Sequence, residues 1–420
     1  MNLPTDTLRR VRGGVMLAAE AVDHLVARIH EFHRAISDIP LKTVSAVPIV
    51  KSGGTPVRRI HDGVTDGVYG IIRGTARAVF AGADRALRAL DAPSLRPALA
   101  PPAPRNARIR DDLVSAVSGV VGDHMAVRRN PLAIRFSVVH GGQRVAPTRA
   151  GLAAAFSGAA PRLAVFVHGL CSSENAWSMF RVPGDARTDP YGERLARDLG
   201  FTPVYVRYNS GLHISRNGVA CARVLEAVHA NWPVPVSEIV LVGHSMGGLV
   251  ARAAADHAAT QGAAWIAALT QLVCLGSPHL GAPLEKAVHV GTHLMKRVPL
   301  SRPIARLLDS RSLGIKDLRW GYTRDAEWRK RDPDAFWTQD RLQAAPVPGV
   351  RYRFVGTCLT RDPDHPLTRA IGDGLVRLPS SLAIDIAGAD GAMRAQLGHL
   401  RLLNHPDVYE LLRDWLSASA

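Results

Sequence analysis

The 420-residue sequence has few cysteines and few aromatic residues, and it lacks any long apolar run. No apolar stretch reaches the length of about 18 residues that a membrane-spanning helix needs. The four cysteines are far apart, with no Cys-x-x-Cys pair, which argues against a disulfide framework or a zinc site. We therefore expect buried thiols in a reducing compartment, at Cys171, Cys221, Cys274 and Cys358.

Acidic residues are outnumbered by basic ones, which gives a formal net charge of +16. A basic excess can serve nucleic acid or an anionic membrane surface. No basic run with interleaved aromatic residues is present, so we expect no nucleic-acid partner. Glu20 and Asp23 interrupt the apolar stretch near the start of the chain, so no secretory signal is predicted. These features indicate a cytoplasmic protein that can associate peripherally with a membrane.

Residues 1–125 are predicted to form a helical N-terminal extension. Apolar residues along 11–36 are spaced alternately by four and three, a seam typical of two packed helices. A second helical stretch, near 60–90, carries regularly spaced glycines that let another backbone approach closely. Two interpretations stay open: a helical hairpin that packs on itself and on the catalytic domain, or a hydrophobic element that lies on a membrane surface or acts as a lid. Prolines near 92–105 indicate a linker.

Residues 126–420 are predicted to form the catalytic domain. From Arg162 onward, short apolar runs alternate with helical patterns, which is typical of a mostly parallel sheet covered by helices on both faces. A segment at about 284–350 is too long for a simple connection and is predicted to be an inserted helical cap. The predicted strands are Leu163–Val167, Pro203–Tyr208, Ile239–Val242, Leu272–Leu275, Arg351–Gly356 and Leu375–Pro379. The predicted helices are Tyr191–Leu199, Gly218–Ala230, Gly248–Thr260 and Pro406–Leu416.

One stretch joins a strand pattern to a helix pattern through Gly243-His244-Ser245-Met246-Gly247. A Gly-x-Ser-x-Gly turn in this context is typical of a nucleophile elbow, which exposes the serine hydroxyl above the sheet. The glycines are needed because side chains there would collide with neighbouring backbone. The pattern predicts that Ser245 is a nucleophile at the N-terminal end of a helix.

A serine nucleophile needs a base, an acid that orients the base, and donors for the oxyanion. The chain order Ser, Asp, His favours Asp373, which glycines flank, and His399, which lies in a predicted loop. The alternatives that stay open are Asp362, Asp364, Asp385 and His405.

The oxyanion donors are expected to be backbone N–H groups on two loops. One is the N–H of Met246, directly after the nucleophile. The second follows the strand that ends at Val167 and belongs to Leu170, or else to Cys171. His168, in the same loop, is expected to be structural.

Several motifs together resemble the bacterial lipase and esterase branch of the α/β-hydrolases. They are His168-Gly169-Leu170, the elbow with Gly248, Gly276-Ser277-Pro278-His279-Leu280-Gly281-Ala282-Pro283 and Gly372-Asp373-Gly374-Leu375-Val376. The Gly-Ser-Pro-His block is shared with GPI-inositol-deacylase-like hydrolases. The resemblance covers about residues 162–420 and implies that Asp373 and His399 complete the catalytic triad. Secreted relatives often carry a calcium-binding aspartate two residues after the histidine; Arg401 stands there, so we expect no metal and no cofactor.

The resemblance implies the α/β-hydrolase fold and a serine hydrolase. The expected reaction is cleavage of carboxylic esters of small-molecule, acyl or lipid-like substrates through an acyl-enzyme. Acyl transfer, thioester cleavage or amide cleavage on the same triad is the alternative within enzymes. A membrane-associated scaffold without catalytic activity is the alternative outside them.

Overall fold

The computed structural model describes residues 9–23, 27, 66, 70, 73–74, 77–78, 80–85, 104–281, 312–329, 345–362, 364, 372–373, 375–383, 386 and 390–417. The chain divides into two compact units. Unit 1 comprises residues 1–103, 125–133 and 288–311; unit 2 comprises residues 104–124, 134–287 and 312–420.

Unit 1 is helical at its described residues before residue 104, including 9–23 and 80–85, whereas its residues 128–133 form turns and irregular structure. Ion pairs join the two helical stretches: Arg12 Nε lies 3.0 Å from Asp84 Oδ1, and Arg73 Nε lies 2.9 Å from Asp23 Oδ1. The early part of one stretch therefore faces the late part of the other, as in an antiparallel helical hairpin. This supports the packing of the hairpin on itself for the described residues; the membrane or lid interpretation stays a prediction.

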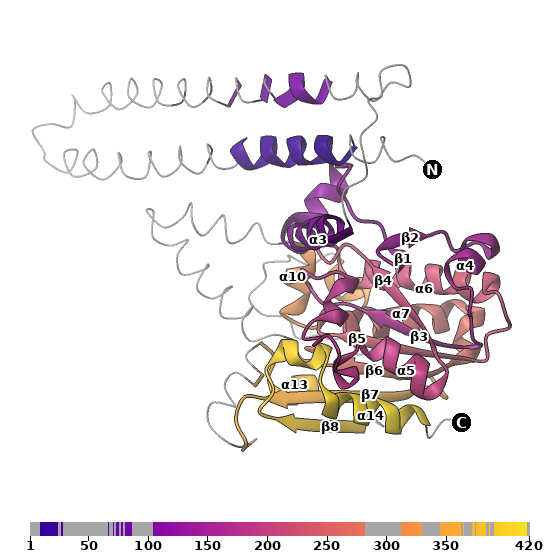
Figure 1. The fold of residues 1–420 in the computed structure, drawn as a ribbon. Coiled ribbons are helices and arrows are strands. Elements are labelled where there is room, and N and C mark those ends of the chain that lie inside the picture. Colours follow the sequence, from indigo (N-terminus) through magenta and orange to yellow (C-terminus); the bar gives the residue numbers. More distant parts are fainter. Residues whose placement is uncertain are drawn as a thin grey trace, which may run out of the picture. The chain divides into compact units, whose positions relative to one another are not determined.

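Unit 2 contains an eight-stranded sheet with the order β2-β1-β4-β3-β5-β6-β7-β8 (Figure 1). Strands β3 to β8 pair in parallel, whereas β1 is antiparallel to both of its neighbours. The strands are β1 (Ser137–His140), β2 (Gln143–Val145), β3 (Arg162–Val167), β4 (Thr202–Arg207), β5 (Glu238–His244), β6 (Leu269–Leu275), β7 (Arg351–Cys358) and β8 (Asp390–Ala395).

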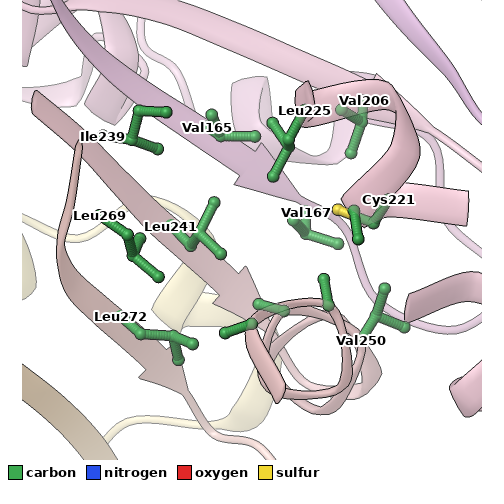
Figure 2. Packing of buried hydrophobic residues seen from close by; sticks show 14 of the residues in the cluster. Val165, Val167, Val206, Cys221, Leu225, Ile239, Leu241, Val250, Leu269 and Leu272 are labelled. Carbon is green, nitrogen blue, oxygen red and sulfur yellow. The ribbon is translucent and has the colours of Figure 1, made fainter. Parts of the chain in front are cut away.

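Alternate residues of the central strands enter two separate apolar cores, because side chains along a strand point to opposite faces. Val165 and Leu241 belong to one core, together with residues of helices α6 (Ile214–Asn231) and α7 (Met246–Gln261). Figure 2 shows this core, with Leu225 and Val250 of the two helices against the strands. The neighbouring strand residues enter the second core with α5 (Tyr191–Leu199) and α14 (Pro406–Ser417). Helices thus cover both faces, as predicted.

Shorter helices complete the described part of unit 2. They are α4 (Arg149–Ala155), α10 (Leu313–Leu318), α11 (Asp325–Trp328) and α13 (Leu378–Ser381). Helices α10 and α11 fall within the predicted cap, most of which lies outside the described residues. Among the described residues, no helix is both long and apolar enough to cross a membrane.

Helix α3 (Pro104–Val127) belongs to unit 2 through residue 124, although the sequence reasoning assigned residues 1–125 to the N-terminal extension. The physical reason is a buried polar contact network. Asp111 of α3 receives a hydrogen bond from Arg207 of β4 at 2.9 Å, and Arg207 also pairs with Glu174. The predicted linker lies mostly outside the described residues.

The strand predicted at Leu375–Pro379 is wrong, and β8 was not predicted. The backbone N–H groups of Leu375 and Val376 donate to Asp373 Oδ1, at 3.0 and 2.8 Å, and Pro379 has no N–H to give to a ladder. Residues 378–381 form α13 instead. Strand β8 lies at the edge of the sheet and contains few apolar residues, so its sequence lacks the apolar pattern by which the other strands were predicted.

We expect an Arg207→Met substitution to lower the free energy of unfolding by about 3–5 kcal/mol, because it leaves two buried carboxylates without their cation. Urea denaturation measures this change. The control is Arg187→Met, which breaks an exposed pair with Asp185 and should leave stability unchanged. Equal effects of the two substitutions would contradict the argument.

Candidate active site

Ser245 occupies the turn between β5 and α7 in a backbone conformation that favours glycine, with φ 53° and ψ −123°. Such a conformation is strained for a residue with a side chain. Two backbone hydrogen bonds fix the turn: Ser245 N donates to Leu275 O at 2.8 Å, and Gly248 N donates to Ser245 O at 3.1 Å. A Cβ atom at Gly247 would collide with the carbonyl oxygen of Val167. The geometry is that of a nucleophile elbow.

The predicted acid and base contact each other directly. His399 Nδ1 lies 2.7 Å from Asp373 Oδ2, and both residues are buried. The other carboxylate oxygen of Asp373 accepts two backbone N–H groups, which fixes its orientation. His399 N also donates to Asp373 O at 3.2 Å. A carboxylate on Nδ1 holds the proton there and leaves Nε2 as a base.

The three predicted residues lie at the carboxyl ends of parallel strands. Ser245 follows β5, Asp373 follows β7 and His399 follows β8. His244 Nε2 lies 3.2 Å from the carbonyl oxygen of His399, and the two rings are 4.8 Å apart. The imidazole is therefore next to the residue that precedes the serine. Of the three residues, all described, only Asp373 and His399 share a hydrogen bond.

The described alternatives for the acid and the base form local contacts within their own turns. Asp362 and Asp364 are exposed, and Asp362 Oδ1 accepts the N–H of Asp364 at 2.9 Å. His405 Nδ1 accepts the N–H of Asp407 at 3.2 Å, at the start of α14. These are local turn and capping contacts. Asp385 lies outside the described residues.

The loop after β3 approaches the serine closely. A Cβ atom at Gly169 would lie 3.2 Å from Ser245 Cβ, so a larger residue there would require the loop or the serine turn to shift slightly. Cys171 N donates to Ser210 Oγ at 3.1 Å, which favours Leu170 over Cys171 as the oxyanion donor. Met246 is the first residue of α7, so its N–H has no acceptor within the helix.

Two buried histidines beside the site are held neutral. Burial lowers the pKa of His168 to about 4 and that of His244 to about 3. Both ring nitrogens of His168 have partners, because Nδ1 lies 2.9 Å from Gly169 O and Nε2 accepts the N–H of Tyr208 at 3.3 Å. His168 is thus occupied structurally and is no candidate for the base.

The Gly-Ser-Pro-His block lies against the helix that follows the nucleophile. A Cβ atom at Gly248 would collide with Ser277 Oγ, and Arg252 of α7 lies 3.0 Å from His279 Nδ1. This motif therefore packs α7 from the β6 side. Sequence reasoning missed the roles of His244, Tyr208 and Ser210, since their partners are distant in the chain and no local pattern points to them.

No group of three or more histidine, cysteine, aspartate or glutamate residues that could hold a metal ion occurs in the described ranges. Arg401, which stands at the position of the calcium ligand in the resembled lipases, lies with its guanidinium 4.5 Å from the ring centre of Phe180. The expectation of no metal or cofactor stays a prediction.

The site and the sheet together define the class of protein. The sheet reverses its strand order at β3, which lies between β4 and β5, and ligand sites of open α/β sheets lie at such a point. The loops that carry Leu170 and Ser245 border it. With the strained serine at the β5–α7 turn, this is the α/β-hydrolase fold.

Comparison with known proteins agrees with that class. Residues 219–330 match the family described as the PGAP1-like alpha/beta domain. The α/β-hydrolase fold that the sequence resemblance implied is confirmed. The comparison with curated protein sequences yields no match.

Solved structures with detectable similarity include three bacterial proteins. A lipase of Bacillus licheniformis is 15% identical, with a TM-score of 0.39, and the match covers 61% of this chain and 91% of that one. An esterase of Thermogutta terrifontis is 14% identical, with a TM-score of 0.37 and coverage of 62% and 91%. A lipase-esterase related protein of Clostridium acetobutylicum is 11% identical, with a TM-score of 0.35 and coverage of 68% and 98%. At these scores the fold assignment rests on the strand order and the serine turn.

The two neutral histidines predict acid-sensitive stability. In the unfolded chain each histidine takes up a proton near pH 6.5, whereas in the folded protein the pKa values are about 4 and about 3. The stabilising contribution is therefore complete above about pH 6.5 and is lost as the pH falls toward the folded values. Urea denaturation between pH 7.5 and pH 5 should show a falling free energy of unfolding with net proton uptake. A free energy that stays constant over this range would contradict the buried neutral state.

Proposed function

We propose that the protein is a serine hydrolase that cleaves carboxylic ester bonds of acyl or lipid-like substrates through an acyl-enzyme. The observation that carries the proposal is the buried contact of 2.7 Å between His399 and Asp373, at the same sheet edge as the strained Ser245. A dyad of this geometry beside a nucleophile elbow supports general-base activation of the serine.

In the proposed reaction, Ser245 Oγ attacks the acyl carbon while His399 Nε2 takes the hydroxyl proton. The N–H groups of Leu170 and Met246 stabilise the oxyanion. The leaving alcohol takes the proton from His399, and the acyl group remains on Ser245. A water molecule then gives a proton to His399 and attacks the acyl carbon. His399 passes that proton to Ser245 Oγ as the bond between Oγ and the acyl carbon breaks, which releases the acid and restores the serine. Asp373 keeps the imidazole in the required tautomer throughout.

The family match over residues 219–330 supports hydrolase chemistry in general. Thioester or amide cleavage, or acyl transfer, would use the same three residues and differ only in the leaving group or the acceptor. A panel of nitrophenyl esters of increasing chain length, matched thioesters and anilides, each with and without lipid vesicles, separates these reactions. Conversion of none of these substrates would favour the scaffold alternative.

Ser245→Ala is expected to abolish ester hydrolysis and fluorophosphonate labelling, because it removes the attacking oxygen. Asp373→Asn should lower kcat by about ten-thousand-fold, because the amide no longer fixes the imidazole tautomer. The matched control is Ser237→Ala, an exposed serine before β5. Thermal unfolding verifies that each variant folds. Retained turnover of p-nitrophenyl esters by Ser245→Ala would exclude this serine as the nucleophile.

We also propose peripheral membrane contact by the last helix of the predicted extension, in a cytoplasmic protein. Part of α3 has an inverted polarity: Asp111, Ser115 and Ser118 are buried, whereas four apolar residues between positions 109 and 120 are exposed. These exposed residues recur every three or four positions, at Ile109, Leu113, Val117 and Val120. An exposed apolar stripe on a protein with a net charge of +16 suits an anionic lipid surface.

The Leu113→Glu substitution should reduce co-sedimentation of the full chain with phosphatidylglycerol-containing vesicles. It replaces an apolar side chain that is 62% exposed with a carboxylate, which anionic lipid repels. Val182→Glu serves as the control, because Val182 is 55% exposed outside α3. The wild-type chain and the control are expected to pellet equally. Equal pelleting of all three proteins, or of none, would remove the proposal.

A further inference from the structure

The loop that carries the expected oxyanion donor, His168–Cys171, is bound by the residues that directly follow β4. Tyr208 and Ser210 each hydrogen-bond to this loop, one at its beginning and one at its end. Leu170 lies between the two attachments. The loop is thus fixed from the β4 side, and at Gly169 it passes close to Ser245, since a Cβ atom there would lie 3.2 Å from Ser245 Cβ.

The first attachment joins Tyr208 to His168. Tyr208 OH donates to the carbonyl oxygen of His168 at 2.7 Å, and the two rings stack with their centres 4.3 Å apart. Tyr208 N donates to His168 Nε2 at 3.3 Å. Burial raises the pKa of Tyr208 above its usual range, so its hydroxyl keeps the proton it donates. These three contacts fix both the backbone and the ring of His168.

The second attachment joins Ser210 to Cys171. Ser210 Oγ accepts the N–H of Cys171 at 3.1 Å, and Cys171 has a φ of 57°, a value that favours glycine. Helix α3 closes against the same residue, since a Cβ atom at Gly119 would collide with Cys171 Sγ. The strained turn directly after Leu170 is therefore held from two sides.

Ser210 is itself held firmly. Its neighbour Asn209 donates to the carbonyl oxygen of Gly122 in α3 at 2.7 Å, and Asn217 of α6 donates to Asn209 O at 2.9 Å. Ser210 is only 1% exposed. Because Ser210 has so little freedom to move, its hydrogen bond holds the bound loop in one position.

We propose that Ser210 and Tyr208 are positioning residues for the oxyanion hole. They touch neither substrate nor nucleophile; they fix the backbone of residues 168–171 so that the N–H of Leu170 meets the developing oxyanion. The inference rests on the proposed hydrolase function. It predicts a loss in kcat with little change in KM, because the oxyanion forms only in the transition state.

Ser210→Ala and Tyr208→Phe each remove one oxygen atom and test the proposal. Each variant should lower kcat and the rate of fluorophosphonate labelling about 10- to 100-fold, while KM for a p-nitrophenyl ester stays near that of the wild type. Ser210→Thr keeps the hydroxyl acceptor and should restore most of the activity. The matched controls are Ser237→Ala and Tyr409→Phe, the second of which removes a buried hydroxyl that donates to Asp198, far along the chain from the loop.

The outcomes separate the two proposals. If the wild type is labelled at Ser245 and kcat and labelling rates are unchanged in Ser210→Ala and Tyr208→Phe, the positioning role is overturned, even if thermal unfolding shows that the variants lose stability. The hydrolase function would then still stand. A wild-type protein that is not labelled, or a Ser245→Ala variant that still turns over ester, would overturn the hydrolase function and this inference with it. A kcat loss in the two variants, with controls at the wild-type level, supports both.

Discussion

The strained backbone at Ser245 is the constraint on which the rest of the site depends. A conformation of this kind costs about 1–3 kcal/mol and persists only where the surroundings determine it fully. Here β5 is buried along its whole length between β3 and β6, and the serine N–H is bound to the end of β6. The sheet therefore holds the serine at a fixed position, and the loop after β3 comes close to it at Gly169.

The loops around that serine are held by elements that the sequence places far from it. Helix α3 contacts the loop after β3 at Cys171 and the β4–α6 junction at Asn209. The same helix accepts a hydrogen bond from Ser312, at the start of the described part of the cap, through Gly119 O at 2.6 Å. A helix assigned to an extension thus packs within unit 2 through residue 124. On its buried face, Gly119 lies so close to the backbone of Cys171 that a Cβ atom there would collide with it.

Much of this could be predicted where the determinants are local. The elbow at Ser245 combines a strand, two glycines and a helix within a few residues, and the glycine beside Asp373 marks a carboxylate held in a turn. The central strands are continuous apolar runs because both of their faces are buried. Strand β8 escaped notice because its edge position leaves it partly exposed. The contacts of Tyr208, Ser210 and His244 could not be predicted, since their partners are remote in the chain.

The position of β8 at the edge of the sheet determines which part of unit 2 opens first under denaturing conditions. His399 follows this strand, which in the described part of the chain pairs only with β7. Border strands open at lower free energy than central ones, so partial fraying there would carry the imidazole away while the elbow between β5 and α7 stays intact. Under mild denaturing stress, inactivation would then precede global unfolding, and it would be reversible once the strand pairs again.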